Sequence, residues 1–185
     1  MDLEISYSER IAGILSELGI ASDYGASRGL DLQPEAVELV TARVLANGRE
    51  LKLVPEAAAA WEAMRSAAAG EGITLLLISG YRSVAYQREI LERKQARGEA
   101  MDAILRVNAA PGYSEHHTGR AVDIGTPGCP PLQEAFEQTD AFRWLRREAG
   151  RFGFHLSFPR DNPHGIIFEP WHWLLGKGGR MRDEG

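Results

Sequence analysis

Two short stretches of the chain carry side chains that suit metal binding and hydrolysis. One runs from Ser114 to Asp123 and includes His116, and the other runs from Glu169 to His172. Together they supply two imidazoles, one carboxylate as a further ligand and a second carboxylate as a base. Three protein ligands, a fourth position for water and a nearby base make up a catalytic zinc site. The combination predicts one zinc ion per chain.

Ordinary structural roles are the alternative for each residue taken alone. A histidine among polar residues most often lies at the surface or makes hydrogen bonds, and we expect this of His117, His155 and His164. An aspartate in a strand often pairs with an arginine, and Arg120 lies near Asp123 in the chain. A structural zinc site is closed and rich in Cys, whereas this chain has one Cys. An open, catalytic site is therefore favoured.

The first stretch is expected to combine a loop with a strand over residues 120–124. Side chains alternate in a strand, so Asp123 and the small Ala121 share one face. Gly119 lets the preceding loop fold back and brings the His116 imidazole over the Asp123 carboxylate. The sequence therefore predicts a metal site above one face of a sheet.

The second stretch cannot be helical, because Pro170 biases Glu169 toward an extended backbone. In a regular strand Glu169 and His172 would face opposite sides, so we expect the chain to bend at residues 170–171. We expect dry walls around this bend from three aromatic residues: Phe168, Trp171 and Trp173.

Hydrophobic periodicity and turn signals predict helices early in the chain and short strands later, which is typical of an α+β fold. A capping box at Ser6 and Glu9 starts the first helix, and Ser83 caps a later one. Helices are expected after residue 6 and over 34–46, 55–69, 83–97 and 141–151. Strands are expected over 73–79, 120–124, 154–158, 166–168 and 171–174.

The composition limits the class of protein. The chain has 185 residues, of which 44% are apolar and 25% charged, as in an ordinary globular domain. Its net charge of -5 gives no broad basic surface for nucleic acid or anionic lipid. We read Cys129 as a packing or loop residue. The sequence shows no membrane span and no signal peptide, which predicts a cytoplasmic protein, or a periplasmic or released one if a leader was removed.

At the residues singled out above, the chain resembles the zinc D-alanyl-D-alanine carboxypeptidases, a family that includes VanY-type enzymes, L,D-carboxypeptidases and dipeptidases. The resemblance covers about residues 50–175, and residues 169–173 match its EPWHW form of ExxH. Two departures are the missing export signal and Leu174-Leu175 where Arg-Tyr is frequent. Its SxHxxGxAxD motif is met by Ser114, His116, Gly119, Ala121 and Asp123, and its SGYRS block followed by Gln by residues 79–83 and Gln87.

The resemblance implies a small central antiparallel sheet flanked by helices, with the zinc site on the sheet. It implies zinc held by His116, Asp123 and His172, with Glu169 as general base and Arg82 facing the substrate. The planar guanidinium of Arg82 suits either a developing oxyanion or a terminal carboxylate. The further candidate substrate contacts are Gln87, Ser114 and Tyr81.

The implied function is a peptidase that acts on peptidoglycan stem peptides or muropeptides and removes a C-terminal D-alanine. An endopeptidase or dipeptidase resembling a phage lysin is the second reading. A zinc-binding module without catalysis is the third, and the presence of both Glu169 and Arg82 argues against it. We expect residues 1–48 to be a helical extension packed on the core, residues 49–176 the peptidase domain and residues 177–185 a flexible tail.

Overall fold

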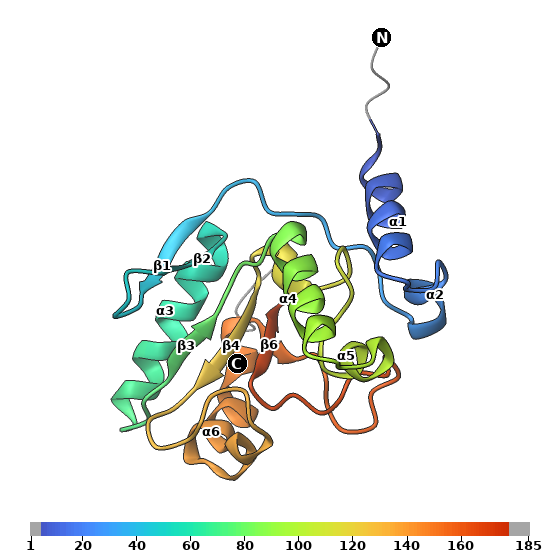
Figure 1. The fold of residues 1–185 in the computed structure, drawn as a ribbon. Helices are drawn as coiled ribbons and strands as arrows, with labels where there is room; N and C mark the ends of the chain where they lie inside the picture. The colour runs from blue at the N-terminus through green and yellow to red at the C-terminus, as the bar shows by residue number, and fades with distance from the viewer. Residues whose placement is uncertain (1–4, 178–185) are drawn as a thin grey trace.

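A four-stranded antiparallel sheet lies between two groups of helices in the computed structural model, which describes residues 5–177 (Figure 1). Its strands run in the order β3 (Leu76–Ser79), β4 (Ala121–Gly125), β6 (His172–Leu175) and β5 (Phe154–Leu156). A separate hairpin is formed by β1 (Val40–Val44) and β2 (Glu50–Leu53). The expected α+β fold with a small antiparallel sheet is confirmed.

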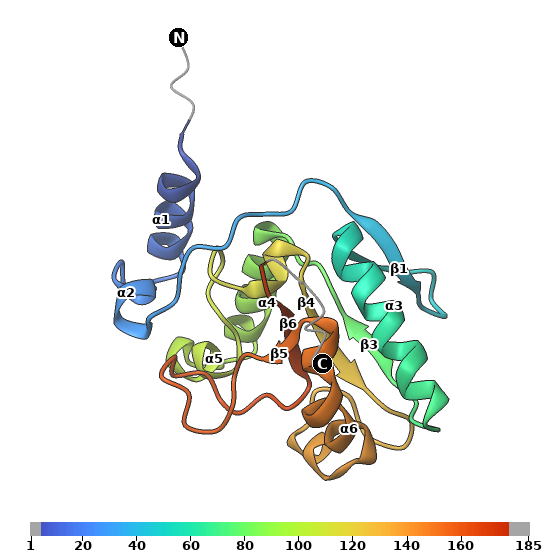
Figure 2. The ribbon, with the colours of Figure 1, turned by 180° about the vertical axis from the view of Figure 1, so that it is seen from behind.

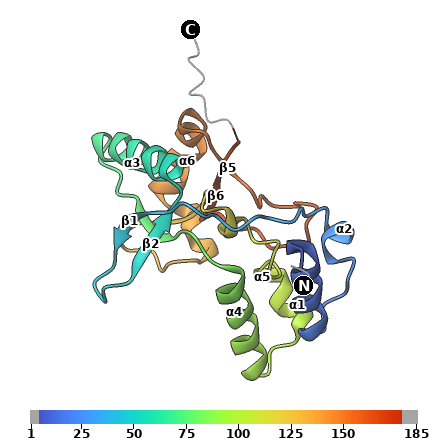
Figure 3. The same ribbon diagram turned by 90° about the horizontal axis from the view of Figure 1, so that it is seen from above.

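The helices gather on two sides of the sheet, as the view from above shows (Figure 3). Seen from behind, α3 and α6 stand in front of the sheet (Figure 2). The α-helices are α1 (Tyr7–Glu17), α2 (Tyr24–Arg28), α3 (Pro55–Gly70), α4 (Val84–Ala96), α5 (Met101–Val107) and α6 (Asp140–Glu148). The short 3-10 helices are η1 (Glu115–Thr118), η2 (Glu134–Gln138) and η3 (Ala149–Phe152).

The two predicted helix caps are present. Ser6 and Glu9 form the capping box of α1, and the Ser83 hydroxyl accepts a hydrogen bond from the Tyr86 N–H at the start of α4. Pro55 occupies the first turn of α3, where its missing N–H leaves no bond unmade.

The larger core lies between the sheet and the helices α3 and α6. Trp61 and Met64 of α3 and Val122 and Ile124 of β4 are buried in it, and full burial of each such side chain contributes about 1.5–3 kcal/mol. Because Val122 and Ile124 face this core, Asp123 points to the other side of the sheet, as the alternation predicted. Ala57 and Ala68 of α3 are buried in the same core.

A second core joins the N-terminal helices to α4 and α5. Ile11 and Leu15 of α1 pack with Leu91 of α4 and Ile104 of α5. Residues of α1 and α2 thus contact the family-like part of the chain, while the domain boundaries at 48 and 176 stay predictions. The predicted tail lies outside the described residues, apart from Lys177.

The helix predicted over residues 34–46 is wrong. The segment is extended and ends in β1, which pairs with β2. Val40, Thr41 and Val44 are β-branched and favour a strand, and Asn47-Gly48 is the strongest short signal for a hairpin turn. Gly48 adopts φ +81° in the loop between the two strands, a left-handed backbone that favours glycine. The strand preference of these residues and the turn after them outweigh the helical spacing of the valines.

Other predicted boundaries shift by a few residues. The strand expected at 73–79 begins at Leu76, and the one expected at 154–158 ends at Leu156. Residues 166–168 form no strand, and the strand expected at 171–174 is β6. Among the described residues, no helix is long and apolar enough to cross a membrane.

Gly119 joins η1 to β4 and sets the direction in which the loop enters the sheet. Its φ is +66°, and an added Cβ would lie 3.0 Å from Val54 Cγ1 and 3.1 Å from Leu39 Cδ2. Both the left-handed backbone and the close neighbours therefore favour glycine.

We expect Gly119→Ala to lower the free energy of unfolding by about 1–3 kcal/mol, because it adds backbone strain and crowding. Urea unfolding followed by circular dichroism measures this. Gly13→Ala is the matched control, since Gly13 lies within α1 with nothing within 4 Å of the added Cβ. An unchanged midpoint for Gly119→Ala would contradict the role assigned to this glycine.

Candidate metal centre

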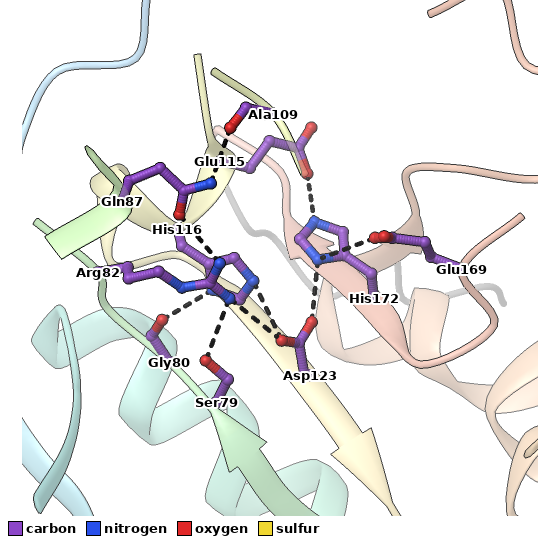
Figure 4. A network of polar contacts seen from close by, with 10 residues as sticks. All are labelled: Ser79, Gly80, Arg82, Gln87, Ala109, Glu115, His116, Asp123, Glu169 and His172. Atoms are coloured by element: carbon purple, nitrogen blue, oxygen red, sulfur yellow. Dashed lines mark hydrogen bonds and ion pairs between the residues drawn. The ribbon is translucent and has the colours of Figure 1, made fainter. Parts of the chain in front are cut away.

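Strand register brings the two halves of the predicted site together. Asp123 of β4 pairs with His172 of β6 on one side and with Ser79 of β3 on the other. Residues paired directly across antiparallel strands share a face and lie close together. His116 reaches the same face from η1, so His116, Asp123 and His172 point toward one another (Figure 4).

These three side chains form a group that suits a metal ion. One ligand atom from each lies within 4.8 Å of the others, and all three residues are buried. His116 Nε2 is 3.3 Å from Asp123 Oδ2, and His172 Nδ1 is 3.0 Å from Asp123 Oδ1. A tetrahedral zinc ion with bonds of about 2.0–2.2 Å holds its ligand atoms roughly 3.4 Å apart. The spacing and the donor types therefore fit zinc.

The free ring nitrogen of each histidine is fixed by a hydrogen bond at its other nitrogen. His116 Nδ1 lies 2.7 Å from the Gly80 carbonyl oxygen, which can only accept, so Nδ1 carries the proton. The lone pair of His116 Nε2 then points at the group. Such a hydrogen bond from the second nitrogen is the usual partner of a metal-bound histidine.

Glu115 does the same for His172, and sequence reasoning missed it. His172 Nε2 donates to Glu115 Oε2 at 2.8 Å, which leaves Nδ1 to face Asp123. Glu115 is adjacent to His116 in the motif, but its position there gives no sign that it contacts His172, 57 residues away.

Burial and close charges shift the pKa values of this group strongly. Burial lowers the pKa of His116 to about 4, helped by the Arg82 charge. Burial also acts to lower the pKa of His172, but hydrogen bonds to Asp123 and Glu115 outweigh it and raise that pKa to about 10. The same histidines hold the pKa of Asp123 well below its usual range, although burial opposes this. A metal ion would take the place of the proton on His172 Nδ1.

Glu169 lies beside the group at the end of the loop before β6. The His172 N–H donates to the Glu169 carbonyl oxygen at 3.0 Å, which closes a turn over Pro170 and Trp171. The bend expected at residues 170–171 is present, and it leaves Glu169 Oε2 4.0 Å from His172 Nδ1. Burial raises the pKa of Glu169 to about 7, although the His172 charge opposes the rise. A carboxylate of this kind can exchange protons near neutral pH.

Arg82 approaches the group from the turn after β3. Its Nη2 is 3.5 Å from Asp123 Oδ2 and 3.4 Å from Ser79 Oγ, and its Nη1 donates to Gln87 Oε1 at 3.0 Å. Gln87 is fully buried and donates through Nε2 to the Ala109 carbonyl. Gln87 thus holds the Arg82 guanidinium and also lines the cavity beside the group, and its predicted contact with substrate stays a prediction.

A cavity of about 110 Å³ opens onto the group. Arg82, Ser114 and Glu169 line it together with the three-residue group, whereas Tyr81 is not among its lining residues. Of the aromatic residues expected as walls, only Trp171 lines the cavity, while Phe168 and Trp173 pack into the larger core. Trp173 still fixes the bend, because its Nε1 donates to the Pro170 carbonyl at 3.0 Å.

The other histidines have ordinary roles, as predicted. His117 is buried, with Nδ1 2.6 Å from the Arg82 carbonyl oxygen and Nε2 accepting from the Gly112 N–H. His164 Nδ1 lies 2.9 Å from the Arg28 carbonyl oxygen. His155 is exposed on β5.

A buried ligand group with a carboxylate left beside it is typical of metallopeptidases. The model of one such family, described as VanY: D-alanyl-D-alanine carboxypeptidase, matches residues 50–176. The chain therefore belongs to the VanY family, and the resemblance seen in its motifs is confirmed.

Individual relatives agree with this assignment. The chain is 39% identical over 124 residues to YodJ of Bacillus subtilis, provisionally named a carboxypeptidase, and the match covers 63% of this chain and 44% of YodJ. A VanY D,D-pentapeptidase variant solved in complex with Zn(II) is 30% identical, with a TM-score of 0.63 over 78% of this chain and 83% of that one. The LD-carboxypeptidase LdcB is 32% identical, with a TM-score of 0.64 over 80% and 69%.

We expect Glu115→Ala to weaken Zn²⁺ binding about 10–100-fold, since loss of a carboxylate behind a ligating histidine has effects of this size. Competition with a chromophoric chelator measures the affinity. Glu115→Gln keeps an acceptor for His172 Nε2 and should lose less.

His116→Ala, which removes a ligand, should weaken binding further than either Glu115 variant. Glu99→Ala, on the exposed turn before α5, is the control and should bind as wild type does. Wild-type affinity in Glu115→Ala would show that Glu115 does not support His172.

Proposed function

We propose that this chain is a zinc-dependent peptidase that removes a C-terminal D-alanine from peptidoglycan stem peptides. One observation carries the proposal. The group His116, Asp123 and His172 fits zinc and shares a small cavity with a spare carboxylate, Glu169, and a fixed cation, Arg82. Membership of the VanY family and the Zn(II) complex of a VanY relative support it.

The assigned chemistry needs a base, a cation and a dry pocket. Zinc bound to the group supplies a Lewis acid that polarises a carbonyl and acidifies a water molecule. Glu169, with a pKa of about 7, takes a proton from the attacking water and later delivers it to the amine of the leaving alanine. Burial raises the pKa of Glu169, so its carboxyl group can both take up and release a proton near neutral pH.

Arg82 supplies the second positive charge. Its guanidinium is held by Gln87 and Ser79 with one face toward Asp123. From there it donates either to the oxygen of the peptide carbonyl or to the free carboxylate at the end of the substrate. Ser114 and Gln87, both buried at the wall of the cavity, are the other predicted polar partners for that carboxylate.

The size of the cavity favours a small terminal residue. About 110 Å³ is well below the 300–1,000 Å³ typical of sites that enclose drug-sized ligands. The end of a peptide with a methyl side chain fits this space better than a large residue does. Solved relatives of similar likeness include a D,D-pentapeptidase and an LD-carboxypeptidase, so both specificities enter the test.

Mass spectrometry of defined tri-, tetra- and pentapeptide stems, incubated with the zinc-loaded chain, tests the proposal. Loss of a single alanine supports a carboxypeptidase, and the stem that loses it shows D,D or L,D specificity. Cleavage deeper in the stem would replace the proposal with an endopeptidase or dipeptidase. No product at full zinc occupancy would leave a binding module. The cytoplasmic location expected from the N-terminal sequence stays a prediction.

We expect Glu169→Gln to bind zinc as wild type does and to lose turnover about 10²–10⁴-fold, because the variant lacks a base but keeps the side-chain volume. Metal analysis and kcat on the cleaved stem peptide are the two measurements. If the variant loses its metal, Glu169 is a ligand and the assignment of roles is wrong.

Arg82→Lys is expected to impair the enzyme strongly, since one ammonium group cannot replace two hydrogen bonds in fixed geometry. The loss should fall mainly on kcat if Arg82 stabilises the oxyanion, and on KM if it binds the terminal carboxylate. Steady-state kinetics separate the two. Values within about twofold of wild type would place Arg82 outside the chemistry.

A further inference from the structure

A segment outside the family match lies against the loop that carries His116 and against the start of α4. Residues 31–39 connect α2 to β1 and cross above α4 (Figure 1), while the VanY match begins at residue 50. Two backbone hydrogen bonds join the segment to the loop that carries His116. The Gln33 N–H donates to Gly112 O at 2.8 Å, and the Ala36 N–H donates to His117 O at 2.8 Å.

Glu35, in the middle of this segment, holds the start of α4. Its Oε1 accepts the Val84 N–H at 2.7 Å, and its Oε2 accepts from Arg10 Nη2 at 2.6 Å. Its side chain is 25% exposed. Although burial acts to raise the pKa of Glu35, these two hydrogen bonds lower it, so the group is an anion held at both oxygens. Tyr81 is also a neighbour, since the Glu35 charge adds to burial in raising the pKa of its phenol.

Arg82, the residue that reaches the metal group, follows Tyr81 directly and lies two residues before Val84. Its own backbone is also tied down, because the Arg82 N–H donates to His116 O at 3.1 Å and His117 Nδ1 donates to Arg82 O at 2.6 Å. Among the hydrogen bonds of residues 5–177, Glu35 is the acidic side chain that binds the backbone of residues 81–84. It binds there on the side away from the metal group.

We propose that Glu35 is a positioning residue for Arg82, and that segment 31–39 therefore belongs to the active site although it lies outside the family match. The inference rests on the proposed function, because it assigns Arg82 to the substrate. Glu35 holds Val84 two residues after Arg82 and so limits how the turn before α4 can move. The guanidinium then stays aimed at the cavity before substrate arrives, which spares the enzyme that ordering step.

A purely structural role for Glu35 makes different predictions. An anion at the first turn of a helix stabilises that helix, and its loss lowers stability. In that case variants that remain folded would have normal turnover, and their effects would be independent of Arg82. Positioning instead predicts that the losses from Glu35 and Arg82 substitutions do not multiply.

A double-mutant cycle on the zinc-loaded full chain separates these roles. Glu35→Ala should lower turnover of the stem peptide on the order of tenfold or more, at a temperature where circular dichroism shows it folded. Glu35→Ala combined with Arg82→Lys should be no slower than Arg82→Lys alone. Multiplying losses, or normal turnover in folded Glu35→Ala, would overturn the proposal. Zn²⁺ affinity should stay within about twofold of wild type, since Glu35 contacts no metal ligand.

Two further variants serve as controls. Glu35→Gln keeps an acceptor for the Val84 N–H and should retain more turnover than Glu35→Ala, which also covers the case in which the alanine variant does not fold. Glu38→Ala removes an exposed acid from the same segment and should behave as wild type. Equal losses in the Gln and Ala variants would contradict a role through Val84.

A readout without catalysis keeps the inference separate from the proposed function. The Nη–H signal of Arg82, whose Nη1 donates to Gln87 Oε1, should be resolved in the NMR spectrum of the wild-type protein and is assigned by its absence in Arg82→Lys. In Glu35→Ala it should broaden or move toward the signals of exposed arginines. If no peptide is cleaved but this change is seen, the proposed function fails and the positioning by Glu35 stands. If the Arg82 signal is unchanged in Glu35→Ala, Glu35 does not position Arg82, whichever peptide the enzyme cleaves.

Discussion

The buried carboxylate of Asp123 is the charge on which the site depends. Removing a carboxylate from water costs several kcal/mol unless it is paired and fully hydrogen-bonded. Asp123 is 3% exposed, and its oxygens meet His116, His172 and Arg82. The positive charge of His172, whose pKa is raised to about 10, stabilises the Asp123 carboxylate. A divalent cation bound between the three ligands would stabilise it more strongly. The buried charge of Asp123 therefore both favours metal binding and attracts the Arg82 guanidinium.

The same strand pattern builds the core and aims this charge. Val122 and Ile124 enter the core beneath α3 and α6, and alternation sends Asp123 to the opposite face. A slip of one residue would put the carboxylate among apolar side chains and the two apolar side chains into the site. The pairing of Asp123 with His172 of β6 then places the His172 side chain on the same face of the sheet. Packing energy in the core therefore enforces the geometry of the polar group above it.

The features that could be predicted from the sequence are those that depend on residue type and on the local alternation of side chains. The ligand types, the alternation in β4 and the bend forced by Pro170 follow from local chemistry, and the structure shows the alternation and the bend. The helix predicted over 34–46 failed because β-branched residues and an Asn-Gly turn outweighed valines at helical spacing. Glu115 was missed for another reason: its partner His172 is 57 residues away, and such a contact exists only after β4 and β6 pair. The contact of Gln87 with Arg82 was not predicted either, because sequence does not show which polar group a buried amide meets; the predicted contact of Gln87 with substrate stays a prediction.

Sequence motifs identify the side chains that contact a ligand. The residues that hold these side chains in place can come from any part of the chain that the fold brings close. The first N–H groups of a helix lack partners within it, so a turn that ends in a helix start needs acceptors from outside. At α4, Ser83 accepts from Tyr86 and Glu35 accepts from Val84. The acceptor for Val84 comes from a segment that precedes the family match. A chain without this segment has to supply another acceptor or a water molecule there, and water holds the turn less firmly. The predicted boundary near residue 48 therefore divides the chain by sequence pattern, whereas the hydrogen-bond network of the site crosses it.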